Sequence, residues 1–210
     1  MRSPKLLKVA LTGGIATGKS HVIDELRRRG IPCLDADALA HGVMTAGTEA
    51  STAIAARFGG DMLDASGAVD RKKLGRLVFA DALARRDLEA IVHPAVYRAI
   101  GAGLRGFELD TAATLAVVDI PLLYETAHAG DFDQVVATLC RVETQEARLM
   151  ARGLTREEAR QRLAAQMSAE EKASRADYVI RTDGSFENTN AQVERVLHDL
   201  IAKARAVTQG

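Results

Sequence analysis

The sequence contains few of the residues that mark disulfide-bonded or nucleic-acid-binding proteins. It has two cysteines in 210 residues, and 4% of its residues are aromatic. Cys33 and Cys140 lie in apolar runs without metal-ligand spacing, which favours small buried side chains in a reducing compartment over a disulfide framework. Lys plus Arg equals Asp plus Glu at 28 each, so no global basic field attracts nucleic acid. The scarcity of aromatic side chains also argues against base-stacking surfaces.

Long apolar stretches are absent as well. No stretch approaches membrane-spanning length, and Met1–Lys5 leads into the first expected strand without the apolar core of a secretory signal. We therefore expect a soluble, cytoplasmic protein with no membrane or nucleic-acid partner, either a monomer or a small homo-oligomer. The length suits one large domain or a core with insertions, and 47% hydrophobic and 27% charged residues are ordinary globular values.

The most informative stretch is Gly13–Ser20, which reads GGIATGKS and fits the pattern G-x-x-x-x-G-K-[ST]. An apolar run, Leu6–Leu11, precedes it, and His21–Leu26 follows with helical spacing. A strand, a glycine-rich loop and a helix start in this order direct backbone N–H groups and the positive helix end at a polyphosphate. Lys19 then reaches the β- and γ-phosphates, and the Ser20 hydroxyl faces a magnesium ion. A turn that only joins strand to helix is the alternative, but the aligned Lys and Ser favour phosphate binding.

Two carboxylates follow the next apolar run, which covers residues 31–34. If this run is the second strand of a parallel sheet, Asp35 and Asp37 lie at the ligand-binding edge. One carboxylate near a bound triphosphate suits a general base or a group that orients a hydroxyl. Asp37 equally suits the N-cap of a helix that begins at Ala38, and spacing alone does not choose between these roles.

Residues 38–110 have a helical, polar-rich pattern interrupted at Gly47, Gly59–Gly60 and Gly67. No part of this segment resembles a strand of the main sheet, so we interpret it as an insertion between the second and third strands. By analogy with phosphate-loop kinases, such an insertion holds the acceptor. His93-Pro94 is expected to begin a helix, with Pro94 at an early position.

Three more strands are expected, at residues 114–121, 132–139 and 177–180. The first is the most apolar run in the chain and contains Asp119, which either helps to hold magnesium or is a paired carboxylate at a strand end; the second alternative is slightly favoured. A final amphipathic helix runs through residues 193–200. Between these strands, residues 141–175 are helical and rich in arginine, and most of these arginines are expected to be solvated. Arg148 and Arg152 share a helix face before a break at Gly153, where they suit stabilisation of a transferring phosphoryl group.

Taken together, the motifs resemble the dephospho-coenzyme A kinases nearly from end to end. The most specific matches are Asp35-Ala36-Asp37, His93-Pro94 and Pro121-Leu122-Leu123 with Glu125. The others are Leu11–Ile15 with Gly18–Ser20, Ala40-His41, Phe58-Gly59, Asp70-Arg71 with Leu74, Val78-Phe79, Leu88-Glu89, Gln145 with Arg148-Leu149 and Arg152, Gln166, and Ala176-Asp177.

The resemblance implies transfer of the γ-phosphate of ATP to the ribose 3′-hydroxyl of dephospho-CoA, with Mg²⁺, as the last step of coenzyme A synthesis. It implies an α/β fold: a P-loop NTPase core with a five-stranded parallel sheet, a helical acceptor-binding insertion and a helical lid. The core would comprise residues 1–37, 111–140 and 176–210, the insertion residues 38–110, and the lid residues 141–175.

The resemblance also implies roles for individual residues. Asp37 becomes the general base, Lys19 stabilises the phosphates, and Ser20 holds the metal. Arg148 and Arg152 are catalytic lid groups. The expected ATP contacts are Gly13, Gly14, Ala16, Thr17, Gly18, Lys19, Ser20 and His21. The expected acceptor contacts are Asp37, Arg71, His93, Leu122, Leu123 and Glu125. The chain departs from the family's usual Gly-Ser-Gly-Lys at Ala16-Thr17, and from its usual Thr at His21.

Two other functions remain as alternatives. A P-loop kinase of a nucleoside, nucleotide or other small metabolite would keep the core and change the acceptor. A nucleotide-dependent switch would use Asp64–Gly67, which spells D-x-x-G. No buried strand precedes that segment, however, and Asn188 and Asn190, the two asparagines, supply no guanine-reading Asn-Lys-x-Asp motif.

Overall fold

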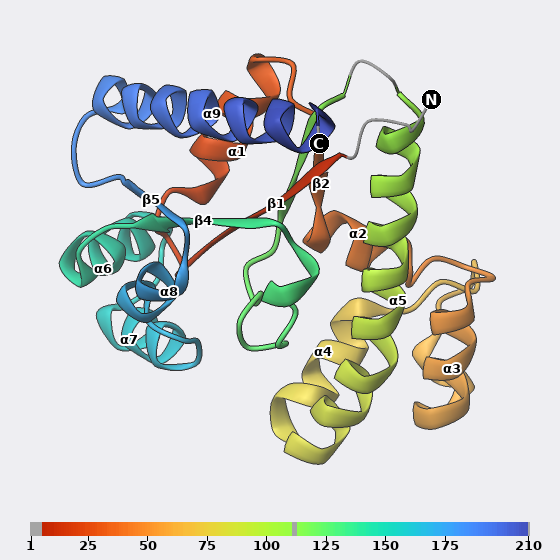
Figure 1. Cartoon of the computed structure of the whole chain (residues 1–210). Helices are drawn as coiled ribbons and strands as arrows, with labels where there is room; N and C mark the ends of the chain where they lie inside the picture. The colour runs from red at the N-terminus through yellow and green to blue at the C-terminus, as the bar shows by residue number, and fades with distance from the viewer. Residues whose placement is uncertain (1–5, 111–112, 210) are drawn as a thin grey trace. The chain divides into compact units, whose positions relative to one another are not determined.

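The computed structural model describes residues 6–110 and 113–209, in which strands and helices alternate along the chain (Figure 1). Met1–Lys5, for which the sequence predicts no secretory signal, lies outside the described residues. The strands are β1 (Leu7–Gly13), β2 (Cys33–Asp35), β3 (Leu115–Asp119), β4 (Gln134–Leu139) and β5 (Tyr178–Arg181). The α-helices outside residues 35–110 are α1 (Lys19–Arg28), α6 (Val142–Ala151), α7 (Arg156–Ala164), α8 (Ala169–Arg175) and α9 (Phe186–Gln209).

The five strands form one parallel sheet in the order β2-β3-β1-β4-β5. In the central register Leu11 of β1 lies beside Asp119 of β3, and Gly13 lies beside Thr138 of β4. Since parallel strands end at the same edge of a sheet, the phosphate loop, Asp119 and the end of β4 share one edge. This arrangement confirms the predicted α/β fold class.

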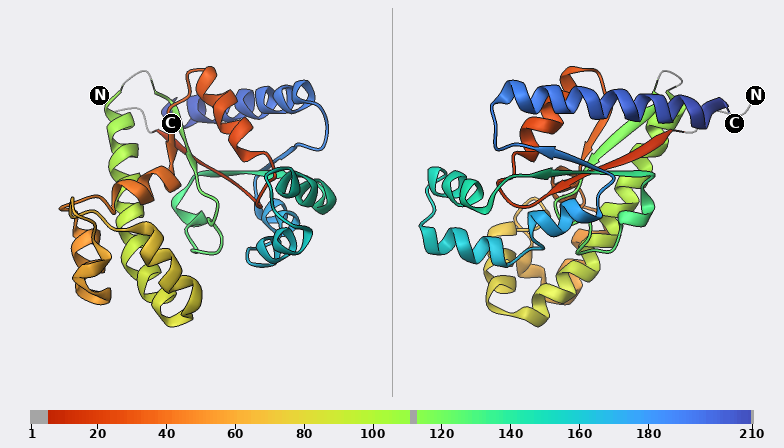
Figure 2. Two further views of the ribbon diagram at one scale, coloured as in Figure 1. Left: turned by 180° about the vertical axis from the view of Figure 1, so that it is seen from behind. Right: turned by 60° about the vertical axis from the view of Figure 1, so that its left-hand side comes forward.

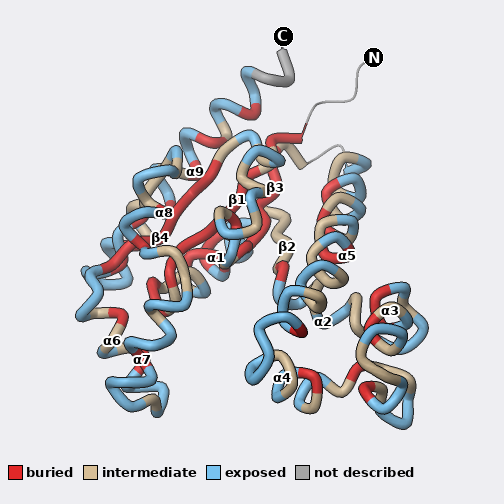
Figure 3. The backbone as a smooth tube through the Cα atoms, turned by 90° about the horizontal axis from the view of Figure 1, so that it is seen from below, coloured by how far each residue is buried: buried red, intermediate tan, exposed pale blue. Residues whose placement is uncertain are grey.

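Apolar side chains cover the sheet on both faces. Helices α1 and α9 pack together on one face, and α8 packs on β1 and β4 on the other (Figures 1 and 2). The core under α1 and α9 consists of Leu7, Val9, Leu11, Val22, Ile23, Leu26, Leu115, Val117, Val136, Ile180, Val193, Leu197, Leu200 and Ala204. Figure 3 shows β1, β3 and β4 as largely buried, as the apolar runs predict for central parallel strands.

The chain divides into two compact units, residues 35–103 and the remainder. Residues 35–103 contain α2 (Ala36–Gly42), α3 (Glu49–Phe58), the short 3₁₀ helix η1 (Gly60–Met62), α4 (Arg71–Ala80) and most of α5 (Ala82–Leu109). This unit has a core of its own, formed by Ile54, Met62, Val69 and Leu74. Of the glycines that interrupt the helical pattern in the sequence, Gly47, Gly59 and Gly67 fall between these helices and Gly60 begins η1. The predicted boundaries of core, insertion and lid stay predictions.

The prediction that His93-Pro94 begins a helix is wrong. Pro94 lies inside α5, which starts at Ala82 and continues to Leu109. Proline lacks the N–H that would bond to the preceding turn, so the helix loses one hydrogen bond at this point. Ala95 and Val96 are buried next to it, which indicates that burial of the helix face outweighs the loss.

The two cysteines are free thiols in the structure. Burial is the main cause that raises the pKa of Cys33 to about 11, and burial also raises the pKa of Cys140. Both side chains are therefore protonated at neutral pH and poorly nucleophilic. Among the described residues, no helix combines the length and apolarity needed to cross a bilayer.

Candidate active site

The phosphate loop joins β1 to α1 in the way that the motif predicts. Gly18 is the N-cap of α1 with φ +86°, a left-handed conformation that glycine adopts without strain. Gly13 is needed for a different reason: a Cβ there would lie 2.1 Å from the Thr138 hydroxyl oxygen and 2.7 Å from that of Thr17. The two glycines therefore allow the left-handed turn and the close approach of β4.

Three side chains, two from α6 and one from the segment after β5, hold the carbonyl groups of the loop. Gln145 Nε2 donates to the Ile15 carbonyl at 2.6 Å, Arg148 donates to the Ala16 carbonyl at 3.1 Å, and the Thr182 hydroxyl donates to the Thr17 carbonyl at 2.6 Å. In a planar trans peptide the following N–H points opposite to the carbonyl. The N–H groups of residues 16 and 18 are thereby turned away from these donors, the orientation in which a phosphate loop presents its donors to an anion. The Thr17 N–H bonds to the Gly14 carbonyl at 3.3 Å and closes the turn.

Ala16 carries the methyl group that distinguishes this loop from Gly-Ser-Gly-Lys. Its φ is +59°, in the left-handed region that an alanine seldom adopts. The methyl group is buried against Leu149 of α6 and Ala159 of α7. The strain at Ala16 is thus offset by packing that fixes the loop against these two helices.

Lys19 is the first residue of α1, and its ammonium pairs with Asp119 at the end of β3. Both side chains are largely buried, with 16% and 8% of their surface exposed. Asp119 is thus paired at a strand end, as the favoured alternative predicts, and a part for it in holding magnesium stays a prediction. The pairing also keeps the lysine at the edge of the sheet where a polyphosphate binds.

Ser20 and His21 follow in the first turn of α1. Ser20 is exposed. His21 Nε2 lies 2.7 Å from Asn190 Oδ1, and its ring centroid lies 4.7 Å from that of Phe186. No signal in the sequence indicates that these two residues of α9 meet the residue after the GKS motif.

The two candidate arginines of α6 have different surroundings. Arg148 is half-buried and bonds to the Ala16 carbonyl, and to the Thr182 hydroxyl at 3.2 Å and carbonyl at 2.6 Å. It therefore ties the phosphate loop to the segment after β5. Arg152 is the exposed C-cap of the same helix, just before Gly153 with φ +93°. The predicted break after Arg152 is confirmed.

The segment after β3 is held by a lysine that the sequence reasoning missed. Lys172 of α8 is completely buried, and its ammonium lies 2.8 Å from a Glu125 carboxylate oxygen and 2.5 Å from the Pro121 carbonyl. The same Glu125 oxygen accepts from the Met167 N–H at 3.1 Å. Lys172 lies in a stretch rich in charged residues, where a solvated side chain is the ordinary expectation. The buried Ala169, three residues earlier on the same face of α8, is the one signal that this face is covered.

The neighbouring leucines differ in exposure. Leu123 is completely buried, whereas Leu122 is 37% exposed. In this structure Leu122 presents its side chain to a ligand more readily, and Leu123 anchors the segment in the core.

The remaining candidates, Asp37, Arg71 and His93, lie on three helices of the unit formed by residues 35–103. Asp35 is the N-cap of α2 and accepts from the Ala38 N–H at 3.0 Å. Of the two alternatives left open for Asp37, the helix cap is therefore wrong, because Asp35 supplies the cap and Asp37 stays exposed in the first turn. Arg71 is exposed in the first turn of α4, and His93 is half-buried in the middle of α5.

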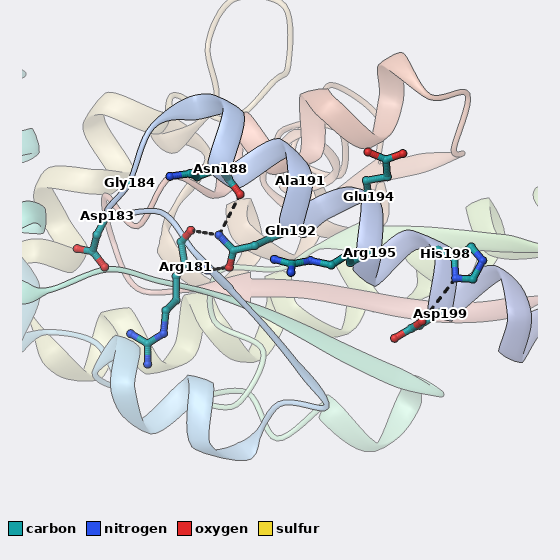
Figure 4. Close-up of a pocket in the computed structure, with 10 residues that line it drawn as sticks. All are labelled: Arg181, Asp183, Gly184, Asn188, Ala191, Gln192, Glu194, Arg195, His198 and Asp199. Carbon is teal, nitrogen blue, oxygen red and sulfur yellow. Dashed lines mark hydrogen bonds and ion pairs between the residues drawn. The ribbon is translucent and has the colours of Figure 1, made fainter.

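A groove of about 1000 Å³ runs along α9 beside β5 (Figure 4). Gln192 closes the edge of the sheet there, since its amide accepts from the Arg181 N–H at 2.9 Å and donates to the Arg181 carbonyl at 2.8 Å. Asp183 at one end of the groove accepts from the Arg141 N–H at 2.9 Å. Burial raises the pKa of Asp183, but the hydrogen bonds from Arg141 and Thr144 outweigh it, so the net shift is downward. A lowered pKa keeps this carboxylate charged and the segment after β5 in place.

The comparisons with known proteins agree with one another. The family model described as dephospho-CoA kinase matches residues 7–188. A dephospho-CoA kinase of Anaeromyxobacter dehalogenans is 47% identical over 196 residues, 91% of this chain and 91% of that protein. One of Symbiobacterium thermophilum is 46% identical over 187 residues, 89% of this chain and 78% of that protein. The solved structure of a dephospho-CoA kinase from Campylobacter jejuni has a TM-score of 0.69 at 27% identity and covers 92% of this chain and 96% of its own.

Proposed function

Because the chain belongs to the dephospho-CoA kinase family, we propose that it transfers the γ-phosphate of ATP to the ribose 3′-hydroxyl of dephospho-CoA. The products are coenzyme A and ADP. The observation that carries this proposal is the phosphate loop, whose carbonyls are held away from the ligand side and whose Lys19 is held beside it by Asp119, an arrangement that suits a polyphosphate. The family match supplies the acceptor. The same match supports a cytoplasmic biosynthetic enzyme.

In the proposed mechanism, each group acts on one part of the transfer. Asp37 takes the proton of the 3′-hydroxyl while that oxygen bonds to the γ-phosphorus, the bond to the β–γ bridging oxygen breaks, and ADP leaves with its electron pair. Lys19 and the loop N–H groups stabilise the charge on the phosphate oxygens. Arg152, with Arg148, would exclude water and stabilise the moving phosphoryl group. The proposed acceptor contacts are Asp37, Arg71, His93, Leu122, Leu123 and Glu125.

Two side chains at the loop fit a magnesium ion. The Ser20 hydroxyl and the Asp119 carboxylate are the hard oxygen donors that Mg²⁺ prefers. The described residues hold no group of three or more His, Cys, Asp or Glu side chains arranged for a metal. Such a group is not required, since nucleotide-bound Mg²⁺ takes one or two protein ligands beside phosphate oxygens and waters. When bound, the ion would neutralise charge on the phosphates.

The direct test is an ADP-release assay with ATP and magnesium, which offers dephospho-CoA, adenosine, AMP or no acceptor. We expect ADP release with dephospho-CoA alone, and mass spectrometry should place the new phosphate on the ribose 3′ position. Equal or faster turnover of adenosine or AMP would assign the chain to nucleoside or nucleotide kinases instead. ADP release that is independent of any acceptor would contradict both assignments.

Arg152→Ala should lower kcat by at least about tenfold and change KM for ATP by less than about threefold, if Arg152 acts mainly on the transition state. Steady-state kinetics with each substrate varied in turn would measure both parameters. Arg156→Ala is the matched control, because Arg156 is an exposed arginine in the first turn of α7 with no proposed role. A change confined to KM would make Arg152 a ground-state binding residue.

A further inference from the structure

An exposed aromatic ring lies beside the phosphate loop. Phe186 is the first residue of α9, and 69% of its surface is exposed. Its ring meets the His21 ring at a centroid distance of 4.7 Å and an interplanar angle of 41°, and Asn190 fixes His21 from one turn further along α9. Single exposed apolar residues are common on protein surfaces, so exposure alone indicates nothing. Its contact with the residue that follows the GKS motif is what sets Phe186 apart.

Phe186 lies on the β5 side of the phosphate loop. The strand order places β3, with Asp119, on one side of β1, and β4 and β5 on the other. The segment after β5 rests on the loop, since the Thr182 hydroxyl bonds to the Thr17 carbonyl and lies 3.3 Å from the Cβ position of Gly18. Four residues later this segment reaches Phe186.

The chemistry of the transfer gives ATP a direction on this loop. The Lys19 ammonium, which binds the β- and γ-phosphates, is held toward β3 by Asp119. In an in-line displacement the acceptor and ADP lie on opposite sides of the γ-phosphorus. The proposed acceptor segment with Leu122 and Glu125 follows β3 in the chain, which places the acceptor on the β3 side of the γ-phosphorus. ADP therefore extends toward β5. The nucleoside end of ATP thereby comes to the side where Phe186 lies.

We propose that Phe186, supported by His21, is a stacking surface for the adenine base of ATP. A flat apolar ring suits any nucleobase because every base has a π-face, and such stacking strengthens the binding of single-stranded nucleic acids. This inference rests on ATP being the phosphoryl donor in the proposed function. It adds a contact for the base, whereas the GKS loop recognises the phosphates alone.

The test compares ATP with inorganic tripolyphosphate, which carries the same phosphates without a base. Isothermal titration calorimetry with magnesium would measure the Kd of each for the full chain and for Phe186→Ala, Phe186→Tyr and Leu109→Ala. We expect Phe186→Ala to weaken ATP binding by about five- to twentyfold and tripolyphosphate binding by less than about twofold. Phe186→Tyr should retain ATP binding because its ring also stacks.

Leu109→Ala is the matched control. Leu109 is 85% exposed and follows Glu108, which pairs with Lys8 at the start of β1, the end of the sheet opposite the loop. Unchanged ATP binding by Phe186→Ala would overturn the proposal, and so would an equal loss of ATP and tripolyphosphate, because that indicates damage to the loop. Thermal denaturation of each variant identifies misfolding. If Phe186→Ala misfolds, the ATP affinity of Phe186→Tyr is used instead, and its retention is the expected result. These binding data stand even if dephospho-CoA proves not to be the acceptor, so the two proposals can fail separately.

Discussion

Asp37→Asn is expected to lower kcat by about 10² to 10⁴ and to leave ATP affinity nearly unchanged, because an amide cannot take the proton of the attacking hydroxyl. The structure removes one competing role for Asp37, since Asp35 caps α2 through the Ala38 N–H. Steady-state kinetics with saturating dephospho-CoA would give kcat, and calorimetric titration with ATP would give the affinity.

Asp35→Asn is the matched control for this experiment. Asparagine caps a helix about as well as aspartate, so the fold should be kept, and we expect kcat to stay within about threefold of the parent. Near-normal turnover by Asp37→Asn would exclude it as the base. If Asp35→Asn loses activity and Asp37→Asn keeps it, Asp35 is the base.

Much of the fold follows from local patterns in the sequence. The apolar runs that became β1, β3 and β4 are buried on both faces, and this burial is what makes such runs readable as parallel strands. The GKS loop was predictable for a different reason: the spacing of its Gly, Lys and Ser residues between a strand and a helix is specific in itself. The close approach of distant Thr138 to Gly13 could not be predicted. The sequence could not show which of Asp35 and Asp37 caps the helix, because aspartate suits a cap at either position. The cap falls on Asp35 because the extended backbone of β2 ends there.

Contacts between distant segments were not predictable in the same way. Pro94 suggested a helix start, yet α5 runs through it, because the burial of neighbouring residues outweighs one lost hydrogen bond. Arg148 and Thr182 meet across 34 residues, and Glu125 and Lys172 meet across 47. Propensity and periodicity carry no information on such pairs, so the charges of residues 141–175, apart from Arg148 and Arg152, resembled solvated surface.

Glu125→Ala is expected to reduce stability strongly, because it leaves the buried Lys172 ammonium without its counter-ion. Breaking a buried ion pair by removing one partner costs about 3–5 kcal/mol. For a domain of 150 to 250 residues this corresponds to a fall in Tm of roughly 6–20 °C. Lys172→Met should cost less, since methionine removes the buried charge, while Glu125 is 24% exposed and keeps the Met167 N–H as a partner. Thermal denaturation of the three proteins would measure the difference.

The double variant Glu125→Gln with Lys172→Met separates a structural pair from a substrate contact. If the pair serves mainly to hold the segment after β3 on α8, the double variant should be more stable than Glu125→Ala, because no unpaired charge remains in the core. Its KM for dephospho-CoA should then stay within about threefold of the parent, since neutral side chains of similar size keep the segment in place. A Glu125→Ala protein with unchanged Tm and a KM for dephospho-CoA raised by tenfold or more would contradict this view. That result would show that the acceptor contact proposed for Glu125 is its main role.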